Sequence, residues 1–281
     1  MTAPRPPAVA GQFYPADGRE LARAIESAFL DRRGPGHLPT RHRSPERHLR
    51  AAIVPHAGYV YSGPIAALAF DRIAAERPPE SVLVLGVDHY GRSSGASLSR
   101  RPWVTPLGPT GVDTGLVDRL NRGPVEVDED AHAQEHSIEV ELPFLEYVVP
   151  KPEFVALMVR FGPLDFLKEV ASVVIQAIQG RDVLLLASTD FSHYVSPERA
   201  DDLDHRAIEP ILKRDAEGLY RTVERHNISM CGIAPTTVLL LALASESLSA
   251  TLLRWGHSGE AEPMDRVVGY AALTLSSAGP L

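Results

Sequence analysis

The chain has 281 residues, of which 44% are hydrophobic and 23% are charged. These proportions are close to those of soluble globular proteins, and they exclude a disordered chain, a collagen and a coiled coil. The formal net charge of −8 argues against binding to nucleic acid or anionic lipid, because binding to phosphate requires clustered cations. A single cysteine, Cys231, excludes an intramolecular disulfide.

No membrane segment or targeting segment is expected. The longest apolar run, residues 238–244, is much shorter than the ~18 residues that indicate a membrane span. The first residues contain no apolar stretch of the kind that signal peptides carry. We therefore expect a cytoplasmic protein.

Hydrophobic periodicity and cap residues predict elements along the whole chain. In chain order, they are a helix at 17–30, a strand at 51–54, a helix at 64–75, a strand at 81–85, a loop at 91–112, helices at 114–121 and 135–148, a strand at 154–159, a helix at 163–179, a strand at 182–187, helices at 197–213, 215–225 and 233–245, and strands at 250–255 and 266–275. Residues 31–50 are polar, Arg-rich and interrupted by Gly and Pro. We interpret them as a surface loop; a basic contact patch is the alternative.

Strands that alternate with helices are typical of the α/β class. The strands are short and apolar throughout, as expected when helices cover both faces of a mostly parallel or mixed central sheet. No linker divides the chain. The sequence therefore predicts one domain over residues 1–281.

Three buried strands each run into a turn that carries a histidine. His56 follows the first strand, His89 the second, and His193 the strand at 182–187. A single histidine in a turn is more often only a hydrogen-bonding group. Ligands bind outside the carboxyl ends of the strands in α/β sheets, so three histidines at equivalent strand ends predict a shared site.

Cys231 lies just before the helix predicted at 233–245. The N-terminal end of a helix lowers the pKa of a nearby thiol, which favours a metal ligand or a nucleophile. The alternative is a buried structural cysteine that acts as a small hydrophobic residue.

A fifth segment, residues 128–137, combines acidic residues with His132 and His136. Histidines four residues apart can share a helix face. Residues 128–134 read as a turn, so only His136 is expected on the helix. The acidic residues would then cap that helix, and the order of residues does not match the zinc-protease motif.

Seven segments carry a resemblance to a known family: RPPAVAGQFYP (5–15), VPHAGYVYSG (54–63), GVDHYG (86–91), WVTPLG (103–108), EHSIEVELPFLEY (135–147), STDFSHY (188–194) and CGIAP (231–235). In these segments the sequence resembles the Memo family, whose bacterial and archaeal members are labelled AmmeMemoRadiSam system protein B. The resemblance extends over almost the full length. It implies an α/β domain like that of the LigB-type class III extradiol dioxygenases, which bind non-haem iron through two histidines and a carboxylate.

The resemblance implies three metal ligands: His56, His89 and Cys231, with the cysteine where the dioxygenases use a carboxylate. It also implies that His193 is a nearby acid/base or a histidine that faces the substrate, and that His136 belongs to the pocket. The chain departs from the family pattern at Asp88 and Tyr90, where the family more often has Asn or Ser and a second His. Asp88 could replace or supplement Cys231.

Further residues complete the expected site. Asp190, three residues before His193, is a candidate to orient that ring, and both are expected in the catalytic group with His136. Glu135 is a candidate pocket residue. Tyr59, Tyr61 and Trp103 are either an aromatic wall of the pocket or part of the core.

Two histidines and a thiolate favour iron, zinc or copper over magnesium or calcium, and iron is the expected metal. The leading hypothesis is a dioxygenase-like oxidoreductase that acts on a small substrate. One alternative is a zinc hydrolase with an activated water. Another is a non-catalytic protein that binds a metal or a peptide and is a partner of radical SAM and AMMECR-type proteins, as the bacterial family name implies.

Overall fold

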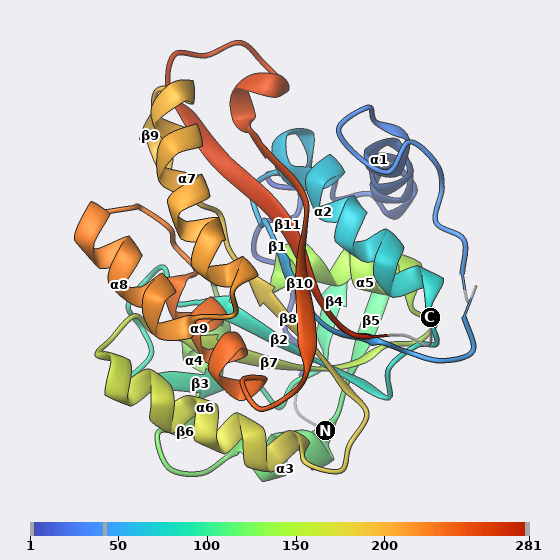
Figure 1. Cartoon of the computed structure of the whole chain (residues 1–281). Helices are drawn as coiled ribbons and strands as arrows, with labels where there is room; N and C mark the ends of the chain where they lie inside the picture. Colours follow the sequence, from blue (N-terminus) through green and yellow to red (C-terminus); the bar gives the residue numbers. More distant parts are fainter. Residues whose placement is uncertain (1–2, 42–43, 279–281) are drawn as a thin grey trace.

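Among the residues that the structure describes, a mixed sheet of 11 strands forms the centre of the molecule (Figure 1). The computed structural model describes residues 3–41 and 44–278. The main path of the sheet follows the order β10-β11-β1-β8-β2-β7-β3-β6. These strands are β10 (Leu248–His257), β11 (Val267–Ser277), β1 (Leu49–Val54), β8 (Val183–Ser188), β2 (Ser81–Val87), β7 (Glu153–Val159), β3 (Ala96–Leu98) and β6 (Val125–Val127). Three short strands pair beside this path: β4 (Trp103–Thr105), β5 (Gly108–Val112) and β9 (His193–Val195).

Four neighbouring strands, β1, β8, β2 and β7, are parallel. β11 and β10 extend the sheet antiparallel on one side, and β3 pairs antiparallel with β7 on the other. The mostly parallel, mixed sheet predicted from the sequence is therefore confirmed. Because β8 lies between β1 and β2, the carboxyl ends of these three strands meet at one edge.

Both faces of the sheet are buried. Side chains alternate along each strand, so Ile53, Leu83 and Leu185 enter one hydrophobic core, and Val54, Val84 and Leu186 enter the other. This explains the continuous apolar runs in the sequence.

Helices cover both faces, as predicted. α1 (Gly18–Leu30), α2 (Tyr59–Ala75) and α5 (Leu142–Val148) lie to one side of β10 and β11 in Figure 1. The other side carries α6 (Leu164–Ile178), α7 (Pro197–Leu212), α8 (Ala216–His226) and α9 (Ile233–Ala242), with α3 (Thr114–Leu120) packed on α6. A single turn, α4 (Glu129–His132), packs near β3. Among the described residues, no helix has both the length and the apolar character needed to cross a bilayer.

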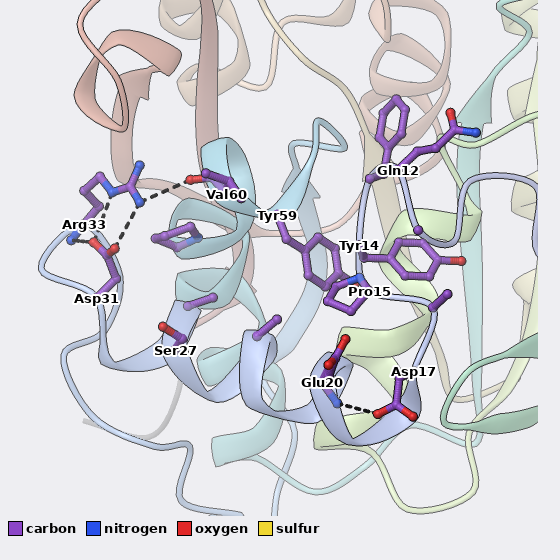
Figure 2. Close-up of a pocket in the computed structure, with 16 residues that line it drawn as sticks. Gln12, Tyr14, Pro15, Asp17, Glu20, Ser27, Asp31, Arg33, Tyr59 and Val60 are labelled. Carbon is purple, nitrogen blue, oxygen red and sulfur yellow. Dashed lines mark hydrogen bonds and ion pairs between the residues drawn. The ribbon is translucent and has the colours of Figure 1, made fainter.

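The second helix begins earlier than predicted. Pro64 suggested its first turn, but α2 starts at Tyr59 and contains Pro64. A proline has no N–H to donate to the carbonyl four residues earlier, that of Val60. Arg33 donates Nη2–H to this carbonyl at 3.3 Å instead, as Figure 2 shows.

The prediction that residues 31–50 form a surface loop holds only in part, and Arg33 is one reason. The described residues 31–41 and 44–48 form no helix or strand, but β1 already begins at Leu49, and residues 42–43 lie outside the described part. Arg33 is buried and paired with Asp31. At least one arginine of this basic segment therefore supports the fold.

Two other predictions were wrong. Residues 91–112 are not a loop, since they contain β3, β4 and β5. Residues 135–148 are not one helix, since α5 begins only at Leu142 after a 3₁₀ turn at Glu139–Glu141. The reason is local: the carboxylate of Glu135 accepts the N–H groups of His136 and Ser137, which holds residues 135–138 in a turn.

Candidate metal centre

Three imidazoles meet at the carboxyl edge of the parallel strands. His56 follows β1, His89 follows β2, and His136 lies in the turn before α5. One ring nitrogen from each lies within 4.8 Å of the other two. The rings of His89 and His136 stack with their centroids 4.5 Å apart. This cluster could hold a divalent metal ion.

His56 is held from behind by β8. It is buried, and its Nδ1 lies 2.8 Å from the hydroxyl oxygen of Ser188, the last residue of that strand. Ser188 can donate its own hydrogen to the carbonyl of Ser137 at 2.7 Å or to Glu141 Oε1 at 2.9 Å. Ser188 therefore accepts Nδ1–H from His56, which leaves Nε2 with a free lone pair for a metal.

His89 is held by a buried carboxylate. Its Nδ1 lies 2.9 Å from Glu135 Oε1, and its backbone N–H donates to Oε2 at 2.9 Å. Burial opposes ionisation of Glu135, but the hydrogen bond from His89 and the backbone N–H groups outweigh it and lower the pKa of Glu135 to about 2. An anion on Nδ1 directs Nε2 of His89 outward and makes it a better ligand.

Burial also lowers the pKa of two of the imidazoles. It lowers the pKa of His56 well below its usual value and that of His136 to about 4. Both rings are therefore neutral at pH 7, which is the form that binds metals.

Cys231 lies beside this cluster. Its Sγ is 3.4 Å from Nε2 of His56. Two such donors on one tetrahedral metal would be roughly 3.5 Å apart, given bond lengths of ~2.0 and ~2.3 Å. The expected lowering of the thiol pKa is wrong for the metal-free chain, because burial and the nearby carboxylate of Asp190 raise the pKa of Cys231.

Two glycines allow these segments to approach so closely. A Cβ at Gly232 would lie 2.2 Å from Cβ of Thr189, so only glycine lets the Cys231 segment contact the end of β8. A Cβ at Gly86 would lie 2.4 Å from Cγ1 of Ile138, so a glycine also lets the His136 turn pack on β2.

Asp190 and His193 lie at this edge but do not form the predicted pair. Asp190 Oδ1 accepts the backbone N–H of His56 at 2.9 Å, and burial raises the pKa of Asp190 to about 6. Nδ1 of His193 lies 2.8 Å from the carbonyl oxygen of Ser229. Asp190 therefore positions the His56 segment, whereas Ser229 orients His193 and leaves its Nε2 without a hydrogen bond from the described residues.

Three other predicted pocket residues serve the fold. Both carboxylate oxygens of Asp88 accept backbone N–H groups of its own loop, from Arg92 and Ser93 at 3.0 Å. Trp103 is fully buried and donates Nε1–H to a serine. Tyr59 is buried and donates its hydroxyl to the carbonyl of Val140 at 2.8 Å. None of the three lies in the histidine cluster.

The sequence analysis missed Ser188 and Glu141. Glu141 is buried, its Oε2 has no hydrogen-bond partner among the described residues, and burial raises its pKa well above the usual value. A glutamate between apolar residues in the segment EHSIEVELPF was the available signal. His132, in contrast, is buried away from the cluster with Nε2 3.0 Å from the carbonyl oxygen of Ser97.

The larger of two cavities near this edge, about 880 Å³, runs along α1 between Asp17 and Arg33 (Figure 2). It contains none of the clustered histidines. It approaches them only at Phe13, whose ring centroid is 4.8 Å from that of His136. A smaller cavity of about 430 Å³ opens beside Cys231.

A family model described as Memo-like protein matches residues 5–274. The chain belongs to the Memo family. It is 40% identical to a MEMO1 family protein of Methanopyrus kandleri over 96% of this chain and 98% of the relative. The corresponding protein of Methanothermobacter thermautotrophicus is 38% identical, over 96% and 99%.

A solved structure, that of an uncharacterised protein of Escherichia coli K12, superposes with a TM-score of 0.51. The match covers 80% of this chain and 99% of the other, at 13% sequence identity. It supports the α/β architecture of this Memo family member.

Proposed function

We propose that this protein binds a divalent transition metal at His56, His89 and Cys231 and acts as a dioxygenase-like oxidoreductase on a small substrate. The observation that carries the proposal is the arrangement of His56 and His89. Each follows a different parallel strand, each has Nδ1 within hydrogen-bond distance of a buried side chain, and each offers a ring nitrogen within 4.8 Å of the other.

The donor set suits iron, zinc or copper. Neutral imidazoles and a thiol are ligands of intermediate or soft character, whereas magnesium and calcium prefer several oxygen donors. Two carboxylates near the cluster, those of Glu135 and Asp190, already accept backbone N–H groups. Iron is the metal we expect.

A metal held there would supply Lewis acidity and, if it is iron, redox chemistry. The chain would supply the rest. Ser229 orients the ring of His193 through Nδ1, and this imidazole would move a proton at neutral pH. His136, half-buried between Phe13 and His89, forms one wall of the substrate space.

The third ligand is tested by two matched variants. We expect Cys231→Ser to lower the affinity for Fe²⁺ more than ~100-fold, which exceeds the usual effect of changing a residue behind a ligand. We expect His136→Asn to have a smaller effect. If His136→Asn lowers the affinity more than Cys231→Ser, His136 is the third ligand and Cys231 is not. Metal titration of purified protein under anaerobic conditions measures both.

A water-activating zinc hydrolase is the second candidate. Three clustered imidazoles favour it, because three histidines are a known catalytic zinc set. Metal analysis of protein purified without oxygen decides between the two, together with oxygen uptake over a panel of catechols. Zinc in the purified protein with no oxygen uptake would overturn the oxidoreductase proposal.

A further inference from the structure

The cavity beside Cys231 has an apolar wall. It is lined by Phe161, Val223, Ile228, Met230, Ile233 and Cys231. Four of these, Val223, Ile228, Met230 and Ile233, are buried, so the wall is fixed by the core. The volume of about 430 Å³ falls within the ~300–1,000 Å³ of typical ligand sites.

The cavity adjoins the candidate metal centre at Cys231. Cys231 lines it, and the thiol of Cys231 contacts Nε2 of His56 at 3.4 Å. Phe161 follows β7 just as His89 follows its neighbour β2. His89 and Phe161 therefore follow neighbouring parallel strands at the same edge of the sheet.

Phe161 is 54% exposed, but contacts with other residues hold its ring in place. Its ring stacks on Tyr220 with centroids 5.9 Å apart and planes 19° from parallel. The hydroxyl of Tyr220 donates to the carbonyl of Gly162 at 3.1 Å, which ties the two segments together. An exposed aromatic ring held in place at a cavity mouth is suited to contact a ligand.

The charge at the mouth restricts the ligand further. The polar residues there are Glu224 and Asn227, and none of the described residues that line the cavity is cationic. An anionic group would meet Glu224 without a compensating charge, whereas a neutral hydrocarbon or aromatic group would meet a complementary wall.

We infer that this cavity is the apolar half of the substrate site. The inference rests on the proposed function. The substrate class is an amphiphilic small molecule that has an oxygen-donor head at the metal centre and an uncharged hydrocarbon or aromatic group against Phe161, Ile228 and Met230. Phe161 determines specificity for that group.

Alkyl hydroxamic acids of increasing chain length test this inference, because each has the same chelating head. They are titrated calorimetrically into the full chain loaded with Zn²⁺. We expect the affinity to rise about fourfold per added methylene until the cavity is filled. A tail that ends in a carboxylate should bind more weakly than the alkyl tail of the same length.

The Phe161→Ala variant tests whether the alkyl tail of the hydroxamate binds against Phe161. Since Phe161 is exposed, its replacement should leave the fold and acetohydroxamate binding unchanged while it reduces the gain per methylene. Ile175→Ala is the control, because Ile175 is a similarly exposed apolar residue on α6 that lines neither cavity. This variant should show the same gain in affinity per methylene as the wild type.

Two results would overturn the inference alone: affinity independent of tail length, or a tail effect that Phe161→Ala leaves intact. If no hydroxamate binds the Zn²⁺-loaded chain, the open coordination position is absent. That result would overturn the proposed function together with this inference.

Discussion

Two buried polar clusters lie four residues apart in the same segment, one at Glu135 and one at Glu139. At Glu139, both carboxylate oxygens are fully used. They accept Nη1–H of Arg5 at 2.7 Å, the hydroxyl of Tyr14 at 2.6 Å, and the backbone N–H groups of Ala8 and Val9. We name Arg5, Tyr14 and Glu139 the N-terminal clamp.

The candidate metal centre is built differently. Its carboxylate, Glu135, is also saturated, but the imidazoles it supports are not. Nε2 of His89 has no hydrogen bond from the described residues, and Nε2 of His56 has only the thiol of Cys231. Buried polar groups are normally paired, whereas His89 is exposed and its Nε2 is accessible to a ligand. Complete pairing therefore marks the part of the segment that stabilises the fold, and free lone pairs mark the part that can bind.

The largest expected effect tests the clamp. Arg5→Ala leaves the carboxylate of Glu139 buried without its cation, which should cost about 3–5 kcal/mol of unfolding free energy. Denaturant unfolding measures the loss. Arg199→Ala removes an arginine from a solvent-exposed ion pair with Asp202 and should change stability little. If the two variants are equally stable, the clamp does not have the role assigned to it.

The next effect tests the support of the metal centre. Glu135→Gln removes the anion behind His89 and should weaken metal binding by about 10–100-fold. The control is Glu146→Gln, since Glu146 is a partly buried glutamate that accepts hydrogen bonds from Thr105 and Thr110 away from the cluster. Metal titration compares the two. Equal losses would mean that any buried glutamate in this region matters only for folding.

The next prediction concerns the pH dependence of stability. His132 is buried outside the histidine cluster, so its protonation should change stability and not metal binding. Burial lowers its pKa to about 4, so below pH ~6.5 the unfolded chain takes up a proton that the folded chain does not. Stability should therefore fall between pH ~6.5 and 4, by up to ~1.4 kcal/mol per pH unit from this group. His132→Gln keeps a donor for Ser97 and should make the fall shallower in metal-free protein. Parallel stability–pH curves for the variant and the wild type would contradict this account.

The smallest effect concerns Tyr59. Tyr59→Phe removes one buried hydrogen bond, to the carbonyl of Val140, and should cost about 1 kcal/mol. Metal affinity should not change, because Tyr59 packs in the core. Weaker metal binding with unchanged stability would show that Tyr59 belongs to the pocket at the metal site and not to the core.

The sequence predicted the parallel strands and the histidines at their ends because apolar runs and turn residues are local signals. It misplaced the segment around Glu135, since the apolar phase of Ile138, Leu142 and Leu145 fits a helix and does not reveal a side chain that binds its own backbone. It missed Ser188 and Glu141 for a related reason. Their roles depend on contacts between distant parts of the chain, since Ser188 contacts His56 and Glu141 contacts Ser188.

The position of β8 determines when, during folding, the segments that carry His56 and His89 are aligned. β1 and β2 are not hydrogen-bonded to each other; β8, which is synthesised long after both, is inserted between them. Until it arrives, His56 lacks the hydroxyl of Ser188, and the segments that carry His56 and His89 have no common strand to align them. Pairing between strands so far apart in sequence is slow to form. A nascent chain therefore does not hold these side chains in place, and a metal ion that the site would bind could meet them aligned only after β8 has paired.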